Sequence, residues 1–211
     1  MSTYEDLSLA VQKGKKKLVE EYTKKAIDEG ADATYILNDV LIDAMGKVGD
    51  SFSKGDIFVP EMLLAARSMK AGVDVLKPYL ATGAAGAMGK CIIGTVAGDL
   101  HDIGKNLVVM MMESAGFEVV DIGVDISEDG FIQAYKENPD AKIIALSALL
   151  TTTMPAMEST VKKIKESDFA DKVKVMVGGA PIDEKFAVQI GADGYAVDAA
   201  SAAEKAKELV S

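Results

Sequence analysis

The stretch GDLHDIGK, residues 98–105, separates two hydrophobic patterns of different period. The segment before it, CIIGTVA (residues 91–97), is an unbroken apolar run of the kind that forms a buried strand, whereas residues 105–115 have the apolar spacing of an amphipathic helix. We therefore predict a strand-to-helix loop over residues 98–105. Such a loop lies at the carboxyl end of a strand, which is where open α/β sheets bind their ligands.

The alternation of strand and helix patterns continues to the end of the chain. Further strands are predicted at residues 118–122, 142–147, 173–177 and 195–197, and further helices at 127–136, 155–166, 183–190 and 199–210. Alternation of this kind predicts a parallel sheet covered by helices on both faces. Five strands favour a flavodoxin/Rossmann-like sheet of order 2-1-3-4-5, in which the loops after strands 1 and 3 open onto one crevice.

The first part of the chain carries helical patterns only. Helices are predicted near residues 4–13, over 15–29, from Asp32 and from Pro60, and short connections between them favour a small antiparallel bundle. The segment ATGAAGAMG (residues 81–89) is uncharged and rich in glycine, which is typical of a flexible linker. We therefore expect an α plus α/β organisation: a helical cap domain (1–80), a linker (81–89) and an α/β domain (90–211).

Charge and cysteine content exclude several classes of protein. The formal net charge of −10 disfavours a nucleic-acid partner and an anionic membrane surface. Cys91, the single cysteine, lies in an apolar run, so no disulfide framework exists and a reducing compartment fits. The N-terminus lacks the pattern of a signal peptide, and no uncharged apolar stretch is long enough to span a membrane. We expect a cytoplasmic protein with no nucleic-acid or membrane partner.

His101 is the single histidine, and by itself it is most simply a loop residue without a role. Two neighbours favour a metal ligand: Asp99 can bond one ring nitrogen and leave the other for a metal, and Gly104 would let a bulky ligand approach the backbone. Zinc needs three or four protein ligands, which His101 and the distant Cys91 cannot supply. Most of the coordination of a metal at His101 must therefore come from a cofactor.

Two later segments each have a functional and an ordinary interpretation. Ser147 and the three threonines at residues 151–153 either bind the polar tail of a ligand and extend the histidine–aspartate pair, or form a strand end with a cap for the next helix. Gly178 and Gly179 either admit a ligand close to the backbone or form a simple strand-to-helix turn.

Together these segments resemble a known family. The pattern Asp99-x-His101-x-x-Gly104, then Ser147-x-Leu149, then Gly178-Gly179, resembles in order and spacing the three-part signature of cobalamin-binding domains. The helical segment before it is similar to the cap domain of methyl-transferring members, so the resemblance covers nearly the whole chain. The likeness is to the stand-alone corrinoid proteins of methylotrophic methyltransferase systems, which serve methylamines, methanol, betaines or aryl methyl ethers. The cobalamin module of methionine synthase is similar.

The resemblance implies a cofactor and a role for each residue. The cofactor is cobalamin or a related corrinoid, cycling between methylcob(III)alamin and cob(I)alamin. His101 would displace the dimethylbenzimidazole of the cofactor and become the lower axial ligand of cobalt, and Asp99 would bond its other nitrogen. Thr153 would complete a His–Asp–hydroxyl relay. The remaining cofactor-binding positions would be Asp102, Ile103, Gly104, Ser147, Leu149, Thr151, Gly178 and Gly179, with Phe58 and Met62, otherwise ordinary core or surface residues, over the upper face.

The function that the resemblance implies is methyl carriage. A substrate:corrinoid methyltransferase would load the methyl group, a methylcorrinoid:coenzyme M or tetrahydrofolate methyltransferase would remove it, and a reductive activase would restore the cofactor. The chain would thus be a methyl-carrying subunit in one-carbon metabolism rather than a self-sufficient enzyme.

Alternatives from other classes share the same fold. A response-regulator receiver needs an aspartate where Ser147 stands. A cobalamin-dependent regulator needs a basic DNA-reading domain, whereas this chain is acidic. The small subunit of a cobalamin-dependent isomerase needs a substrate barrel, and the helical cap fits methyl transfer better.

Overall fold

The computed structural model describes residues 3–79 and 88–211. They divide into two compact units, one built from the N-terminal helices and one that begins at Met88. The predicted linker, residues 81–89, lies almost wholly outside the described residues. Its last residue, Gly89, already belongs to the first strand.

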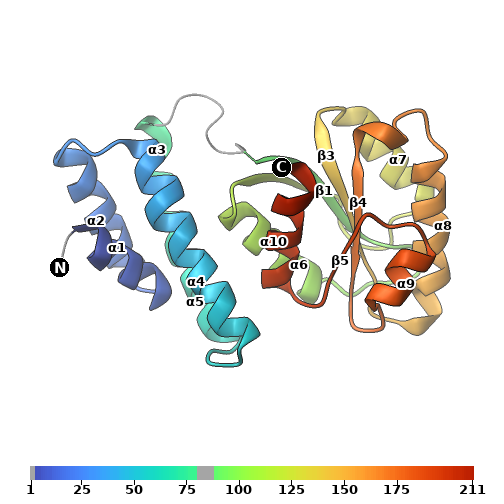
Figure 1. The fold of residues 1–211 in the computed structure, drawn as a ribbon, viewed down its shortest axis with the longest axis horizontal. Coiled ribbons are helices and arrows are strands. Elements are labelled where there is room, and N and C mark those ends of the chain that lie inside the picture. The colour runs from blue at the N-terminus through green and yellow to red at the C-terminus, as the bar shows by residue number, and fades with distance from the viewer. Residues whose placement is uncertain (1–2, 80–87) are drawn as a thin grey trace. The chain divides into compact units, whose positions relative to one another are not determined.

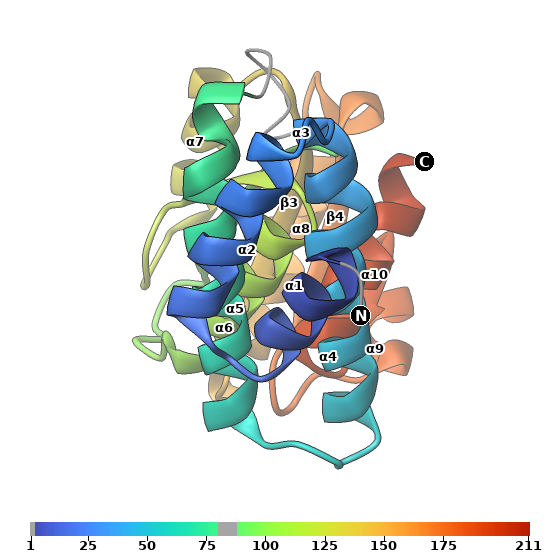
Figure 2. The same ribbon diagram turned by 90° about the vertical axis from the view of Figure 1, so that its left-hand side faces the viewer.

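The N-terminal unit is helical, as predicted. Its long helices pack side by side, with α1 against α2 and α4, and α5 against α2 and α4 (Figure 2). The elements are α1 (Thr3–Gln12), α2 (Lys16–Asp28), α3 (Ala33–Tyr35), η1 (Ile36–Ile42), α4 (Asp43–Ser53), α5 (Val59–Leu76) and η2 (Lys77–Tyr79). In α5, the helix predicted from Pro60, an apolar stripe at helical spacing is buried, and it contains Met62, Ala66, Met69 and Leu76. This stripe holds α5 to its neighbours in the bundle.

One helix of this unit is less regular than its sequence indicates. Asp32 caps it through hydrogen bonds from the Thr34 and Tyr35 N–H groups. Directly after Tyr35 the helix becomes π-helical over the seven residues of η1, and it then continues as α4. The apolar positions alone predict an uninterrupted α-helix, because their spacing does not distinguish a local change in hydrogen bonding. A π-helical stretch inside an α-helix is uncommon.

The second unit contains a five-stranded parallel sheet of order β2-β1-β3-β4-β5, which confirms the predicted topology. The strands are β1 (Gly89–Thr95), β2 (Phe117–Asp121), β3 (Ala141–Ser147), β4 (Lys174–Gly178) and β5 (Gly194–Ala196). The order changes direction between β1 and β3, so the loops after these two strands emerge next to each other. Those loops carry His101 and Thr153.

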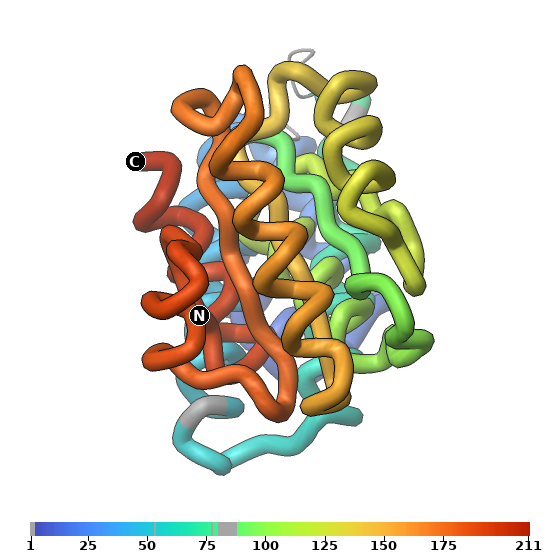
Figure 3. Tube along the Cα trace, turned by 90° about the vertical axis from the view of Figure 1, so that its right-hand side faces the viewer, coloured from blue at the N-terminus to red at the C-terminus, as the bar shows by residue number. Residues whose placement is uncertain are grey.

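Helices cover both faces of this sheet, as the alternating pattern predicts. Figures 1 and 3 show α7, α8 and α9 against one face, and Figure 1 shows α6 and α10 against the other. The helices are α6 (Ile103–Ser114), α7 (Glu128–Glu137), α8 (Met154–Lys165), α9 (Glu184–Gln189) and α10 (Ala199–Val210), with short turns η3 (Thr151–Thr153) and η4 (Ala170–Lys172). No helix in the described part of the chain is long and apolar enough to cross a membrane.

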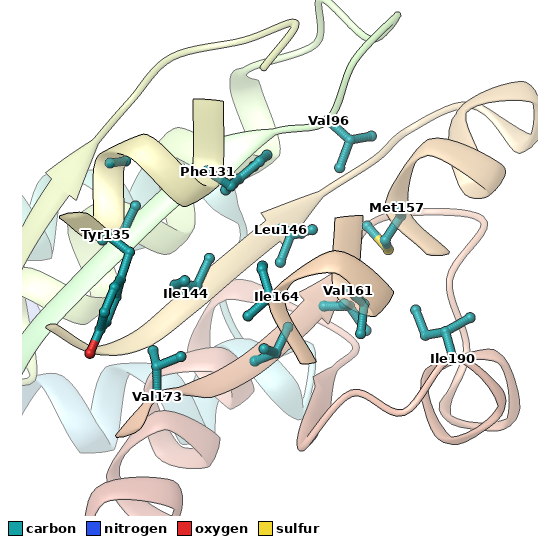
Figure 4. Packing of buried hydrophobic residues seen from close by; sticks show 14 of the residues in the cluster. Val96, Phe131, Tyr135, Ile144, Leu146, Met157, Val161, Ile164, Val173 and Ile190 are labelled. Carbon is teal, nitrogen blue, oxygen red and sulfur yellow. The ribbon is translucent and has the colours of Figure 1, made fainter. Parts of the chain in front are cut away.

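A continuous apolar cluster fixes the sheet against α7, α8 and α9 (Figure 4). Ile144 and Leu146 of β3 lie at its centre, with Phe131 from α7 and Met157 and Val161 from α8, and all five are buried. Burying side chains of this size contributes about 1.5–3 kcal/mol each. This packing therefore holds the carboxyl ends of β1 and β3 in fixed positions relative to α7 and α8.

Candidate functional site

The loop between β1 and α6 holds His101 at three points. The carboxylate of Asp99 accepts from the His101 backbone N–H (3.1 Å) and lies 2.7 Å from ring atom Nδ1, both through Oδ1. The buried hydroxyl of Thr95, the last residue of β1, donates to the His101 carbonyl at 2.9 Å. The backbone and one ring nitrogen are thus fixed, while half of the side chain (51%) stays exposed.

Asp99 is completely buried and accepts hydrogen bonds at both oxygens. Its Oδ2 accepts from the N–H groups of Leu149 (2.7 Å) and Leu150 (3.3 Å) and from the Thr153 hydroxyl (2.9 Å). Burial by itself would raise the pKa of Asp99, but the bonds from Leu149, His101 and Thr153 outweigh it and hold that pKa well below its usual range. Asp99 is therefore a carboxylate at neutral pH.

The charge of Asp99 decides the tautomer of the imidazole. An ionised carboxylate only accepts, so the proton shared with it must reside on Nδ1. In the neutral ring, Nε2 then carries a lone pair, and no described residue donates to it in this structure. Asp99 and His101 therefore present a single oriented nitrogen ligand, the arrangement usual for a metal-bound histidine.

The loop after β3 contributes more than a helix cap. Thr153 stands at the N-cap of α8 but makes no capping hydrogen bond, because its hydroxyl is directed to Asp99 and to the Leu150 carbonyl. The hydroxyl is therefore part of the histidine–aspartate network, and the simple cap interpretation is wrong for this residue. Thr151 and Thr152 are exposed, and Ser147 is partly buried at the end of β3. Of the four predicted hydroxyls, Thr153 is the one that reaches Asp99.

The glycines of the predicted signature have different surroundings. A Cβ on Gly104 would meet nothing within 4 Å, so the start of α6 is open. A Cβ on Gly179, whose φ is +133°, would lie 1.8 Å from the Ala148 carbonyl oxygen. Gly179 is thus required by close approach of its own chain, which is the turn interpretation. Gly178 continues the pairing with β3, since its carbonyl accepts from the Ala148 N–H at 3.2 Å.

Exposed apolar side chains lie in the two loops that hold His101 and Asp99, and the sequence did not single out two of them. Ile103 (78% exposed) and Leu149 were predicted, whereas Leu100 (73% exposed) and Leu150 were not. The feature of the sequence that could have revealed Leu100 is that it and Ile103 are large apolar residues inside a loop, where polar residues are the norm. Such a set around one exposed imidazole suits a large, flat, partly apolar ligand.

The other predicted positions are less directly connected to His101. Asp102 is exposed and its carboxylate accepts from Asn106 at 3.2 Å within the first turn of α6. In the N-terminal unit, Phe58 is 70% exposed and its N–H donates to Glu61 at 2.7 Å, whereas Met62 is buried. The burial of Met62 is what ordinary core packing predicts.

An ion pair between buried Lys105 and Asp121, which is partly exposed, supports the start of α6. Lys105, directly after Gly104, is 3% exposed and its Nζ lies 2.5 Å from Asp121 at the end of β2 and 2.8 Å from the Asn106 side chain. A buried ammonium requires such partners. The pair fixes α6 to β2 next to the loop that carries His101.

Within residues 3–79 and 88–211, no group of three or more His, Cys, Asp or Glu side chains is placed to hold a metal ion. A metal bound at His101 would have one ligand from the described part of the chain.

Comparisons with known proteins agree with this geometry. Two models of a B12 binding domain match the chain, over residues 89–204 and 3–77. Dimethylamine corrinoid protein 1 of Methanosarcina acetivorans is 44% identical over 98% of this chain and 96% of its own length. A cobalamin-binding protein from Desulfitobacterium hafniense DCB-2 matches with a TM-score of 0.85 and 31% identity, covering 100% of this chain and 99% of that one. The methanol:cobalamin methyltransferase complex MtaBC from Methanosarcina barkeri contains a chain that matches with a TM-score of 0.84 and 27% identity, covering 99% and 79% respectively. The chain therefore belongs to the family of B12-binding corrinoid proteins.

Proposed function

We propose that this chain is a methyl-carrying corrinoid protein, which binds its cofactor through His101 and exchanges a methyl group with partner methyltransferases. The observation that carries the proposal is the 2.7 Å contact between Nδ1 of His101 and the buried carboxylate of Asp99, which leaves Nε2 as the available ligand atom of a half-exposed side chain. Membership of the corrinoid family supports a corrinoid cofactor.

The residues around His101 fit a corrinoid. One oriented imidazole nitrogen is what a metal that already carries a macrocycle requires, and the exposed Leu100, Ile103, Leu149 and Leu150 would lie against an apolar ring. The open start of α6 at Gly104 leaves room for a bulky ligand. When bound, the corrinoid supplies a cobalt that accepts and releases a methyl group.

The protein's own contribution is to hold one proton and one lone pair in place. Because Asp99 stays ionised, it keeps the imidazole proton on Nδ1 and leaves the lone pair on Nε2. Thr153 and the N–H groups of Leu149 and Leu150 satisfy the second carboxylate oxygen, so Asp99 cannot rotate away from His101. In the predicted relay, therefore, Asp99 acts as a fixed acceptor that orients His101, and Thr153 positions Asp99.

The remaining predicted cofactor contacts belong to this proposal. Ser147 and Thr151 offer hydroxyls and Gly178 and Gly179 offer backbone at the same sheet edge, where the detached nucleotide tail of the corrinoid would lie. Asp102 begins the helix turn next to His101. Phe58, exposed at the start of α5, is proposed to cover the methyl-bearing face, and Met62 to support it from within the helical unit.

The proposed partners are proteins that load and unload the methyl group. The complex MtaBC, which matches this chain, is a methanol:cobalamin methyltransferase complex, and this supports a methyltransferase as the loading partner. We propose a second methyltransferase, acting on coenzyme M or tetrahydrofolate, as the acceptor and a reductive activase as the third partner. The single buried cysteine supports a cytoplasmic location.

Reconstitution tests the function without a known partner. The purified chain, mixed with methylcobalamin or adenosylcobalamin and desalted, is expected to retain one methylcobalamin per chain, with an absorption spectrum that changes on exposure to light. Retention of neither cofactor would contradict the proposal. Selective retention of adenosylcobalamin would instead favour the isomerase subunit, which the comparisons with methylamine corrinoid proteins do not favour.

A further inference from the structure

Asp125, in the loop between β2 and α7, has an unusual backbone. It is the one non-glycine residue in the described part of the chain with a positive φ, at 54°. This left-handed region disfavours residues with a Cβ, although aspartate and asparagine enter it more readily than others. Such conformations persist where surrounding contacts determine them, and they cluster at functional sites.

The contacts of Asp125 go to the loop that carries His101. Its carboxylate Oδ1 accepts from the Gly98 N–H at 2.7 Å, and its own N–H donates to the Asp99 carbonyl at 3.0 Å. Asp125 thereby holds both ends of the Gly98–Asp99 dipeptide. Because φ is the rotation about the N–Cα bond, a negative φ with the N–H still bonded to Asp99 would turn the Asp125 side chain in another direction. The left-handed backbone is therefore what allows both bonds at once.

The loop that presents Asp125 is itself anchored to β1 and α6. The Thr95 N–H donates to the Gly123 carbonyl (3.0 Å), and the Ile126 N–H donates to the Thr95 carbonyl (2.9 Å). Gly123 also donates to Asp121, the partner of buried Lys105. Asp125 thus connects this anchored loop to the Gly98–Asp99 backbone through two hydrogen bonds.

We propose that Asp125 is a positioning residue for His101. By fixing the backbone of Asp99, it sets the direction of the buried carboxylate, and the carboxylate in turn fixes the tautomer and orientation of the imidazole. The importance of this orientation for cobalt rests on the proposed function. The positioning itself is a property of the chain without cofactor, so it is tested without cofactor.

The chain offers a direct test because His101 is its single histidine. Incorporation of ¹⁵N-histidine into the full, corrinoid-free chain gives one imidazole spin system, whose two nitrogen shifts report the tautomer at alkaline pH. In the wild type we expect one proton-bearing Nδ1 and one bare Nε2. Asp125→Ala and Asp125→Gly both remove the acceptor for Gly98, and both are expected to move the two nitrogen shifts toward the mixed-tautomer values of free histidine.

Matched variants separate positioning from simple damage to the fold. Asp125→Asn keeps an oxygen acceptor and tolerates the left-handed backbone, so it should restore the wild-type shifts. Asp129→Ala removes a nearby exposed carboxylate that pairs with Lys163 and should leave the shifts unchanged. If Asp125→Gly has wild-type shifts while Asp125→Ala does not, backbone strain is responsible and the proposal is wrong.

Hydrogen exchange on the wild type provides a test that needs no variant. The amide protons of Gly98 and Asp125 should exchange at least tenfold more slowly than the same residues in an unfolded peptide, because both donate hydrogen bonds. Unprotected amides at both positions, or wild-type imidazole shifts in both Asp125→Ala and Asp125→Gly, would overturn the proposal. Because no cofactor is present in either experiment, failure of corrinoid binding would not imitate these results.

Discussion

Asp99→Asn changes the size of the side chain very little but replaces one of two accepting carboxylate oxygens with an NH₂ group, which donates. The amide has one oxygen and one NH₂ group, and each would face donors. At the Oδ2 position the NH₂ group would oppose the backbone N–H groups of Leu149 and Leu150, whereas at Oδ1 it would oppose one, that of His101. We therefore expect the NH₂ group toward His101. Nδ1 must then accept, so the imidazole proton moves to Nε2 and the lone pair for cobalt is lost.

The cost of this change follows from the bonds involved. The unpaired His101 N–H costs about 1–3 kcal/mol, and the bonds from Leu149 and Thr153 each weaken by about 1 kcal/mol because their acceptor is no longer charged. We expect the α/β unit to lose about 3–5 kcal/mol of unfolding free energy near pH 7, measured by urea denaturation. The ¹⁵N-histidine spectrum should show the proton on Nε2.

The same variant has a defined pH dependence. The folded-state pKa of Asp99 is lowered, so its ionised form stabilises the fold fully above about pH 4 and this stabilisation is lost as pH falls toward the folded pKa. Asparagine has no such dependence at this position. The difference in stability between wild type and Asp99→Asn should therefore be largest at neutral pH and shrink below about pH 4. A constant difference from pH 7 to pH 3, or an unchanged tautomer, would refute this reasoning.

Three further changes test separate parts of the structure. Thr153→Val removes the hydroxyl bonded to Asp99 and should cost about 1.5–3 kcal/mol in urea denaturation, whereas Thr153→Ser should cost less than half as much; equal losses would contradict the role of the hydroxyl. In Gly179→Ala the new Cβ must displace the Ala148 carbonyl, so the melting temperature of this variant should be well below that of Gly191→Ala. Gly191 also has a positive φ, but a Cβ there would meet nothing within 4 Å, and similar melting temperatures for the two variants would contradict the close approach at Gly179. Cys91 is completely buried and burial raises the pKa of its thiol, so a thiol reagent should label it only after unfolding; rapid labelling in native buffer would place β1 outside the core.

The sequence predicts the sheet well because hydrophobic periodicity is a local property. The apolar runs at β1 and β3 and the helix patterns between them imply parallel pairing, and the crossover rules then place the two loops together. The predicted first strand began at Cys91, with Gly89 in the linker and Lys90 in the α/β domain before the strand, because glycine and lysine do not resemble a buried strand. The structure shows why they pair: Lys90 bonds Asp140 at 3.1 Å, next to the start of β3.

The network around His101 is only partly predictable. Asp99 is close in sequence, so its bond to His101 could be inferred from the motif. The contacts from Leu149 and Leu150 come from backbone N–H groups, which no residue type reveals. Asp125 was missed because its role depends on one left-handed backbone angle in a loop that bears no motif. Long-range contacts made by loop backbone leave no periodic signal in a single sequence.

The central claim is that His101 supplies the lower ligand of cobalt. The measurement that tests it most directly is electron paramagnetic resonance of the cobalt(II) form of the reconstituted chain, prepared with natural histidine and with ¹⁵N-histidine. A ligand nitrogen from His101 should split each cobalt line into three with ¹⁴N and into two with ¹⁵N, since the chain contains a single histidine. A three-line splitting that persists after ¹⁵N labelling would assign the nitrogen to the cofactor's own base and would contradict the claim.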